Sequence, residues 1–205
     1  MKDLEELYAE ERALHAEGIS LVCGVDEAGR GPLAGPVCAA AVILPEGCEL
    51  SGLDDSKKLT EKKREALFDL IRERALTFGI AFASVEEIEE MNILSAALLA
   101  MDRAILQLVP RPDLALIDGN TIRGIHVPAR SIVGGDGKCA CIAAASVLAK
   151  VTRDRLMKRL GEEYPAYGFE KHKGYGTRAH YEALEKYGPS PVHRMSFLKK
   201  FYAGR

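Results

Sequence analysis

Apolar residues in this chain form two patterns. Some occur in short continuous runs, as in buried strands, and others recur at helical spacing, so the chain predicts a mixed α/β fold. The short runs predict buried strands at residues 20–25, 36–44, 76–83 and 113–118, with weaker strand candidates at 122–127 and 131–133. The stripes predict helices at residues 3–17, 60–75, 92–108, 138–164 and 177–187, and a last segment from Pro191. Thr60 is a candidate N-cap, and Ser84 to Glu87 form a capping box that opens a further helix.

The order of these elements predicts an α/β fold in which helices flank a mixed sheet, followed by a helical C-terminal extension. The chain has 205 residues, a length that suits one domain with its own hydrophobic core. We therefore predict a single domain over residues 1–205, with the helical C-terminal extension at about 160–205.

Composition narrows the class of protein. Hydrophobic residues make up 47% of the chain and charged residues 28%, the balance of an ordinary globular protein. No apolar run approaches the roughly 18 residues of a membrane span, and the acidic N-terminus does not resemble a signal peptide. The five cysteines form no CxxC pair, which favours reduced thiols. We expect a cytoplasmic protein that does not contact membranes.

Charge is unevenly distributed, although the net charge is only −2. Residues 150–205 hold 13 Lys and Arg against 6 Asp and Glu, whereas residues 1–149 hold 15 basic and 24 acidic residues. A basic C-terminal quarter fits a face that binds polyanions, and it equally fits an ordinary solvated helical surface. Charge alone leaves both interpretations open.

Four acidic residues stand where predicted elements begin or end. Asp26 and Glu27 follow a strand and precede a Gly-rich loop, Asp118 ends another strand, and Asp136 lies in a Gly-rich segment before a helix. Each alone also fits a turn or an N-cap. Because acids in such places can converge at one edge of a sheet, together they predict a site for a hard divalent cation such as Mg²⁺ or Mn²⁺.

Other site motifs are excluded by their spacing. Gly29-Arg30-Gly31 does not continue into a dinucleotide-binding loop, because Ala34 occupies the position of the third Gly. Gly137-Lys138 is followed by Cys139 and not by the Ser or Thr of a P-loop. The histidines show no HExxH spacing, and the cysteines show no zinc-ribbon spacing.

Several segments resemble the type 2 ribonucleases H, the ribonuclease HII family, and they occur in that family's order. The longest is Gly24-Val-Asp-Glu-Ala-Gly-Arg-Gly-Pro-Leu-Ala-Gly-Pro-Val37, which is long enough to be highly specific. The others are Asp55–Leu59, Ile117–Gly119, Gly135–Lys138, Ile142–Arg155, Lys171–Thr177 and His193–Phe197.

This resemblance implies a ribonuclease H-like mixed β-sheet flanked by helices, with a helical C-terminal region. The implied catalytic acids and metal ligands are Asp26, Glu27, Asp118 and Asp136, which would hold two divalent ions, Mg²⁺ or Mn²⁺, with Asp26 shared by both. The implied enzyme hydrolyses the RNA strand of RNA–DNA hybrids and nicks DNA 5′ of embedded ribonucleotides, giving 5′-phosphate and 3′-hydroxyl ends. Its implied roles are ribonucleotide removal from DNA and primer RNA removal.

The resemblance also implies substrate contacts. Gly29-Arg30-Gly31 would sense the ribose 2′-hydroxyl at an RNA–DNA junction, and Tyr175 would stack on the neighbouring deoxyribose. Only RNA offers a 2′-hydroxyl, and glycine lets the backbone approach it closely. Arg30 could equally pair with Glu27, or do both. Candidates for phosphate contacts are Lys57, Lys58 and Lys138, with Lys150, Arg153, Lys171 and Lys173 extending that track.

The expected partners are RNA–DNA hybrids and DNA containing ribonucleotides, and we expect a monomer. The tail Leu198–Tyr202 has a faint likeness to a sliding-clamp-binding peptide, but Met195 stands where such peptides carry Gln, so we expect no clamp contact. Three rivals remain: a type 3 ribonuclease H, a catalytically silent nucleic-acid-binding module, and an unrelated acid-pair hydrolase such as a glycosidase. Asp26 argues against the type 3 enzyme, which carries Glu at that position.

Overall fold

The computed structural model describes residues 4–48 and 50–203. Within them, strands form a five-stranded mixed sheet in the order β3-β2-β1-β4-β5. β1 (Val22–Ala28) pairs antiparallel with β2 (Val37–Ile43), which pairs antiparallel with β3 (Thr77–Ala83). On its other side β1 pairs parallel with β4 (Leu114–Asp118), which pairs parallel with β5 (Ala129–Ile132). The mixed sheet expected from the sequence is confirmed.

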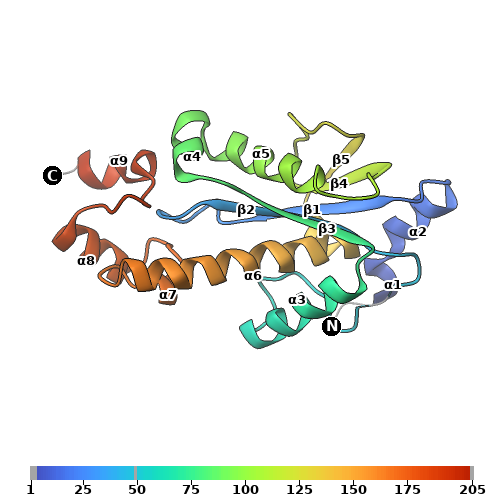
Figure 1. Ribbon diagram of the computed structural model, residues 1–205, viewed down its shortest axis with the longest axis horizontal. Coiled ribbons are helices and arrows are strands. Elements are labelled where there is room, and N and C mark those ends of the chain that lie inside the picture. The colour runs from blue at the N-terminus through green and yellow to red at the C-terminus, as the bar shows by residue number, and fades with distance from the viewer. Residues whose placement is uncertain (1–3, 49, 204–205) are drawn as a thin grey trace.

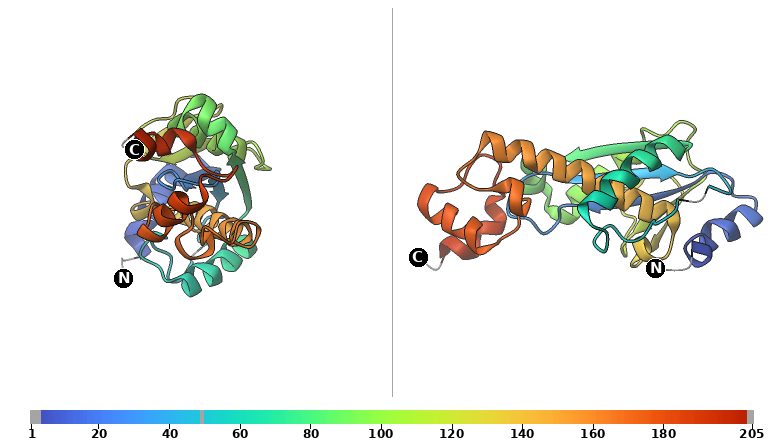
Figure 2. Two further views of the ribbon diagram at one scale, coloured as in Figure 1. Left: turned by 90° about the vertical axis from the view of Figure 1, so that its left-hand side faces the viewer. Right: turned by 90° about the horizontal axis from the view of Figure 1, so that it is seen from below.

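Helices cover both faces of this sheet (Figure 1). α6 (Ala140–Glu163) and α3 (Glu61–Arg74) lie on one face, and α4 (Val85–Met91) and α5 (Ile93–Ile105) lie on the other. The remaining helices described are α1 (Leu4–Leu7), α2 (Ala9–Ala16), the 3₁₀ turn η1 (Gly135–Gly137), α7 (Phe169–His172), α8 (Arg178–Tyr187) and α9 (Met195–Ala203). Figure 2 shows the N-terminal helices and the C-terminal helices at opposite ends of an elongated molecule.

Small side chains let α6 pack closely on the sheet. The alanines at 39–41 in β2 and at 143–145 in α6 are fully buried. An ideal Cβ on Gly24 of β1 would lie only 2.1 Å from the carbonyl carbon of Cys141, so only glycine permits this approach. The close contact brings the start of α6, and η1 just before it, against the centre of the sheet.

Alternation along the strands decides which face their acids occupy. Val25 and Ile117 belong to the core cluster beneath α5, and they are paired in the register of β1 with β4. Because successive side chains point to opposite faces, Asp26 and Asp118 both face α6. The two carboxylates therefore emerge side by side from neighbouring strands.

Two strand predictions were inaccurate. β1 runs on to Ala28, so Asp26 and Glu27 lie within the strand and not after it. The strand predicted at 122–127 is absent from the described chain, because Gly124 at φ 81° turns the backbone there. Ile125 and Val127 still pack on the core, which accounts for their strand-like pattern. The neighbouring candidate at 131–133 corresponds to β5, which begins earlier, at Ala129.

The helix predictions fared better. Thr60 accepts a hydrogen bond from the Lys63 amide as the N-cap of α3, and the capping box from Ser84 to Glu87 opens α4. The helix predicted at 3–17 is divided at Tyr8 into α1 and α2, with residue 3 outside the described residues. The short helix α7 was not predicted.

The C-terminal helices form an apolar cluster of their own that includes Phe169, Leu184 and Leu198 together with Leu33 and Ala34 from the β1–β2 connection. The predicted helical C-terminal region is thus confirmed, whereas its treatment as part of a single domain stays a prediction. In the described residues no helix is both long and apolar enough to cross a membrane.

Candidate active site

Three of the four predicted acids converge. Oxygens of Asp26 in β1, Asp118 at the end of β4 and Asp136 in η1 all lie within 4.8 Å of one another. The 3₁₀ turn is fixed to the strand end because the Gly135 amide donates to Asp118 Oδ1 at 2.7 Å. An ideal Cβ on Gly135 would lie 2.5 Å from Ile142 Cδ1, so a larger residue there would displace the end of that side chain. Asp136, which could have been a simple N-cap, instead points back to the sheet.

Burial makes this cluster electrostatically costly. Asp26 is 4% exposed, and burial, followed by the charges of Glu27 and Asp118, raises its pKa well above the usual value. Burial also raises the pKa of Asp118, against the opposing effect of the Gly135 hydrogen bond. A divalent cation would relieve this repulsion, and carboxylate oxygens are the ligands that Mg²⁺ and Mn²⁺ prefer. The donor set therefore fits a hard metal ion.

Glu27, the fourth predicted acid, has a different environment. Its Oε1 lies 3.3 Å from Nη1 of Arg30, so the alternative ion pair considered for Arg30 is formed. Burial raises the pKa of Glu27, and the charge of Arg30 opposes that shift. Glu27 lines the same cavity as Asp26 and Asp118 but is not among the three converging carboxylates.

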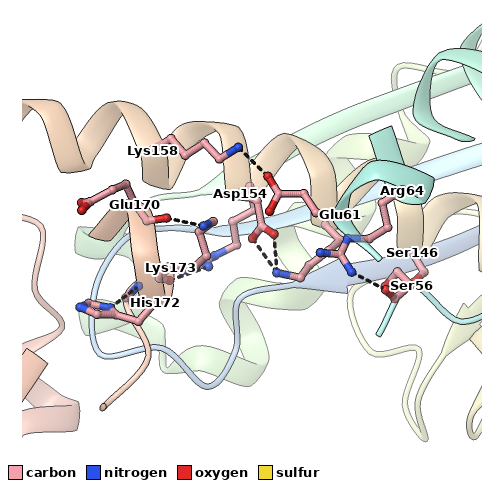
Figure 3. Close-up of polar contacts among 12 residues, drawn as sticks. Ser56, Glu61, Arg64, Ser146, Asp154, Lys158, Glu170, His172 and Lys173 are labelled. Carbon is pink, nitrogen blue, oxygen red and sulfur yellow. Dashed lines mark hydrogen bonds and ion pairs between the residues drawn. The ribbon is translucent and has the colours of Figure 1, made fainter. Parts of the chain in front are cut away.

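Lys57 reaches the cluster from the connection between β2 and α3. Its Nζ lies 3.1 Å from Asp136 Oδ2. Burial lowers the pKa of Lys57, but the hydrogen bond and charge of Asp136 outweigh this, and the pKa is raised overall. The neighbouring Ser56 is held by Ser146 Oγ at 2.6 Å and by Arg64, which donates to its carbonyl at 2.9 Å (Figure 3). These contacts fix the backbone that carries Lys57.

A cavity of about 220 Å³ opens over these groups. Its walls include the predicted Gly29-Arg30-Gly31 segment and Tyr175. Gly29 has φ 103°, and an ideal Cβ on Gly31 would lie 3.4 Å from Cε1 of the Tyr175 ring. The Tyr175 side chain is exposed, so its ring is available to a ligand. The structure thus brings the predicted junction-sensing segment, the tyrosine and three of the four acids, Asp26, Glu27 and Asp118, to one cavity.

Lys58 and Lys138 do not join this cavity. Lys58 Nζ lies 3.4 Å from Asp54 Oδ1 and borders a separate groove beside α3. Lys138 Nζ donates to the Val133 carbonyl at 2.6 Å. Of the three lysines proposed as phosphate contacts, only Lys57 lines the cavity.

The extended basic track is mostly engaged within the protein. Lys150 lines the cavity, but its Nζ lies 2.6 Å from both oxygens of Asp154. Lys173 donates through its Nζ to the Glu170 carbonyl (Figure 3), and Lys171 is exposed. Arg153 is 1% exposed and donates to three backbone carbonyls, so it is not a surface phosphate contact.

Two buried arginines had no structural role assigned from sequence, namely Arg153, which lines the cavity, and Arg194, which does not. Arg194 is fully buried and, like Arg153, donates to the connection between β1 and β2. In the sequence, Arg194 stood out only because it lies in His193–Phe197, one of the segments that resemble the family, and that segment gave no indication of what Arg194 contacts.

Comparison with known proteins gives a consistent result. A family model described as ribonuclease HII matches residues 23–200. A ribonuclease HII of Endomicrobium trichonymphae is 54% identical over 192 residues, which cover 93% of this chain and 91% of that protein. A ribonuclease HII of Dechloromonas aromatica (strain RCB) is 58% identical over 179 residues, covering 87% of this chain and 91% of that protein.

Solved structures show the same fold. Ribonuclease H2 from Pyrococcus horikoshii OT3 matches with a TM-score of 0.71 at 26% identity, covering 90% of this chain and 99% of that chain. RNase HII of Archaeoglobus fulgidus, solved in complex with PCNA, matches with a TM-score of 0.71 at 26% identity, covering 85% of this chain and 94% of that chain. Bst-RNase HIII in complex with Mn²⁺ matches with a TM-score of 0.70 at 18% identity, covering 93% of this chain and 72% of that chain, which shows a shared fold alone.

Proposed function

The chain belongs to the ribonuclease HII family, and we propose that it nicks DNA 5′ of embedded ribonucleotides as well as cutting the RNA strand of longer hybrids. Membership of this family establishes the general activity. The protein is a metal-dependent endoribonuclease that acts on RNA paired with DNA or embedded in it. The rival interpretations as a type 3 enzyme, a silent binding module or a glycosidase are thereby set aside.

The observation that carries the proposal is the buried convergence of Asp26, Asp118 and Asp136 within 4.8 Å, beside a cavity that also holds Glu27. We assign these four acids as the catalytic residues and metal ligands, with Asp26 shared by two ions, Mg²⁺ or Mn²⁺. Bound there, the ions would supply the charge that activates water and stabilises the leaving 3′ oxygen. The products would carry 5′-phosphate and 3′-hydroxyl ends.

The walls of the cavity would select the substrate. Backbone groups of Gly29-Arg30-Gly31 are proposed to hydrogen-bond the ribose 2′-hydroxyl, which DNA lacks. The exposed Tyr175 ring, which lies beside Gly31 in the wall of the cavity, would pack on the next deoxyribose and exclude a 2′ substituent there. Lys57 would exchange part of its contact with Asp136 for a backbone phosphate. A ribose followed by a deoxyribose therefore fits this wall best.

The remaining expectations for the protein are also proposals. We propose roles in ribonucleotide removal from DNA and in primer RNA removal, a cytoplasmic location, a monomeric state and one domain over residues 1–205. We also retain the proposal that the tail does not bind a clamp. Its support is that Leu198 is fully buried and that the Phe201 ring packs 5.2 Å from that of Tyr181.

The test uses a labelled DNA duplex that holds one ribonucleotide, with Mg²⁺, with Mn²⁺ or with a chelator. We expect a metal-dependent nick on the 5′ side of the ribonucleotide, and loss of the nick in Asp136→Asn. A long RNA–DNA hybrid is the parallel substrate. Cleavage of the hybrid without a nick at the single ribonucleotide would keep the nuclease and refute the junction-sensing proposal.

A further inference from the structure

The connection between β1 and β2 is held from beneath by a buried arginine of the C-terminal region. Arg194 is fully buried and donates to the carbonyl oxygens of Gly29 at 2.7 Å, Arg30 at 3.1 Å, Pro32 at 2.8 Å and Gly35 at 2.8 and 2.6 Å. Its own backbone amide donates to the Leu33 carbonyl at 2.8 Å. One side chain therefore fixes four carbonyls in a segment of seven residues.

A second arginine acts on the far half of the same segment. Arg153 of α6 donates to the carbonyls of Ala34 at 3.1 Å and Pro36 at 3.0 Å, and to that of Lys173 at 3.1 Å. The guanidinium end of its side chain also packs under Gly29, where an ideal Cβ would lie 1.9 Å from Arg153 Nε. Arg153 thus touches the same segment as Arg194 without bonding the carbonyls of Gly29 or Arg30.

Neither guanidinium pairs with a carboxylate in the described part of the chain. Burying a cation without a paired carboxylate is costly, and here the carbonyl dipoles, together with the Phe197 ring 5.2 Å from the Arg194 guanidinium carbon, offset the cost. Burial, followed by the charge of Arg153, lowers the pKa of Arg194 to about 9, so Arg194 is still charged at neutral pH. Such an arrangement constrains the direction of every peptide group it touches.

Peptide geometry carries this constraint to the cavity. In a planar trans peptide the N–H points opposite to the carbonyl of the preceding residue. With the carbonyls of Gly29 and Arg30 turned inward to Arg194, the N–H groups of Arg30 and Gly31 are turned outward, and both residues line the cavity. Among the described residues neither N–H has an acceptor.

We propose that Arg194 is a positioning residue for substrate selection, which holds the Arg30 and Gly31 N–H groups as donors toward the ribose. This rests on the proposed function, in which the Gly29-Arg30-Gly31 backbone reads the 2′-hydroxyl. It adds that the reading depends on a side chain from the C-terminal region that never touches the nucleic acid. Figure 1 shows the β1–β2 connection reaching the end of the molecule where α7, α8 and α9 gather.

The experiment compares two duplexes of one sequence, all DNA or with a single ribonucleotide. Their dissociation constants are measured by fluorescence anisotropy with Ca²⁺ in place of Mg²⁺ to prevent cutting. For Arg194→Lys, which keeps the charge but not the five-bond fork, we expect the preference for the ribonucleotide duplex to fall on the order of tenfold. Affinity for the all-DNA duplex should stay within about twofold, because phosphate contacts are unchanged.

Arg103→Lys is the control, because it removes a guanidinium that donates to a backbone carbonyl, that of Phe82, away from this cavity. We expect the preference of this control variant for the ribonucleotide duplex to stay within about twofold of the wild-type value, even if its melting temperature falls as much as that of Arg194→Lys. An Arg194→Lys protein that keeps the full preference would overturn the inference, and so would an equal loss in both variants. A wild-type protein with no preference would overturn the proposed junction sensing itself, and the inference with it.

A measurement on the wild-type protein covers the case in which Arg194→Lys does not fold. Amide hydrogen exchange is followed by NMR at Arg30 and Gly31. Both amides should exchange rapidly in the free protein and slow by about tenfold or more with the ribonucleotide duplex, but not with the all-DNA duplex. Slow exchange of both in the free protein would mean that they already have acceptors, which would overturn the inference.

Discussion

Removing one site carboxylate should stabilise the metal-free protein while it abolishes activity. The change is Asp118→Asn, which is nearly isosteric and keeps the Oδ1 acceptor that the Gly135 amide uses at 2.7 Å. It removes a negative charge from a group of carboxylates whose oxygens lie within 4.8 Å of one another. Packing and the main hydrogen bond are retained, so the dominant change is the loss of repulsion.

The size of the effect follows from these distances. Two unit charges 4.8 Å apart repel by about 3 kcal/mol at an effective dielectric constant of about 20. The full value is not expected, because Asp26 holds its proton more tightly than a free carboxyl and Lys57 neutralises part of the field. We expect a net stabilisation of about 1–3 kcal/mol, or roughly 2–12 °C in Tm for a chain of this length.

The assay is thermal unfolding at about pH 8, in chelator and in saturating Mg²⁺. In chelator Asp118→Asn should melt above the wild type. In Mg²⁺ the order should reverse, because the wild type gains about 3 kcal/mol when free metal exceeds Kd a hundredfold. Asp69→Asn, a change at an exposed position of α3, is the control and should shift neither curve by more than about 0.5 kcal/mol. An Asp118→Asn protein that melts below the wild type in chelator would refute the repulsion argument.

Three further predictions concern other parts of the molecule. Burial lowers the pKa of His193 from 6.5 to about 4, so the neutral ring contributes stability that is present above pH 6.5 and is lost as the pH falls toward 4. Urea unfolding should show a loss of about 3 kcal/mol over this range, and His193→Gln should flatten the slope. Gly24→Ala should lower the free energy of unfolding by about 3 kcal/mol or more, because the new methyl would meet the α6 backbone at 2.1 Å. Gly47→Ala is the control, since it has open space around it but a φ of 73°, and it should cost only about 1 kcal/mol in the same urea experiment. Lys57→Met should lower kcat/KM on an RNA–DNA hybrid about tenfold, and Lys58→Met, the matched change outside the cavity, less than about threefold. Equal losses in the two lysine variants would argue against a specific role for the first.

Much of the site was accessible from the sequence because its parts lie next to local signals. Asp118 closes a short apolar run and precedes a glycine, so its position at a strand end follows from periodicity alone. Asp136 lies between glycines before a long helical stripe, which predicts a turn at the start of a helix. That Asp118 and Asp136 meet depends on the pairing of β1 with β4 and on the close packing of α6 over Gly24, and neither of these contacts is local in sequence. The resemblance to a family supplied that link.

What sequence reasoning could not supply are contacts between distant positions that have no pattern of their own. Lys58 and Lys138 carry the same charge as Lys57 and stand as close to site motifs, yet Asp54 and the Val133 carbonyl hold them elsewhere. Arg194 is the reverse case, a residue that the sequence did not single out but that contacts a segment of the site. In a basic quarter of the chain it looks like one more surface cation, but it lies 165 positions from the Gly29 carbonyl that it binds. Its proposed role becomes visible only in the fold, where the carbonyls it holds belong to the same peptide groups as the N–H donors that we propose face the substrate. If the proposal holds, a charged residue near a nucleic-acid site acts on specificity without any contact with the nucleic acid, and its burial is what distinguishes it from a phosphate-binding residue.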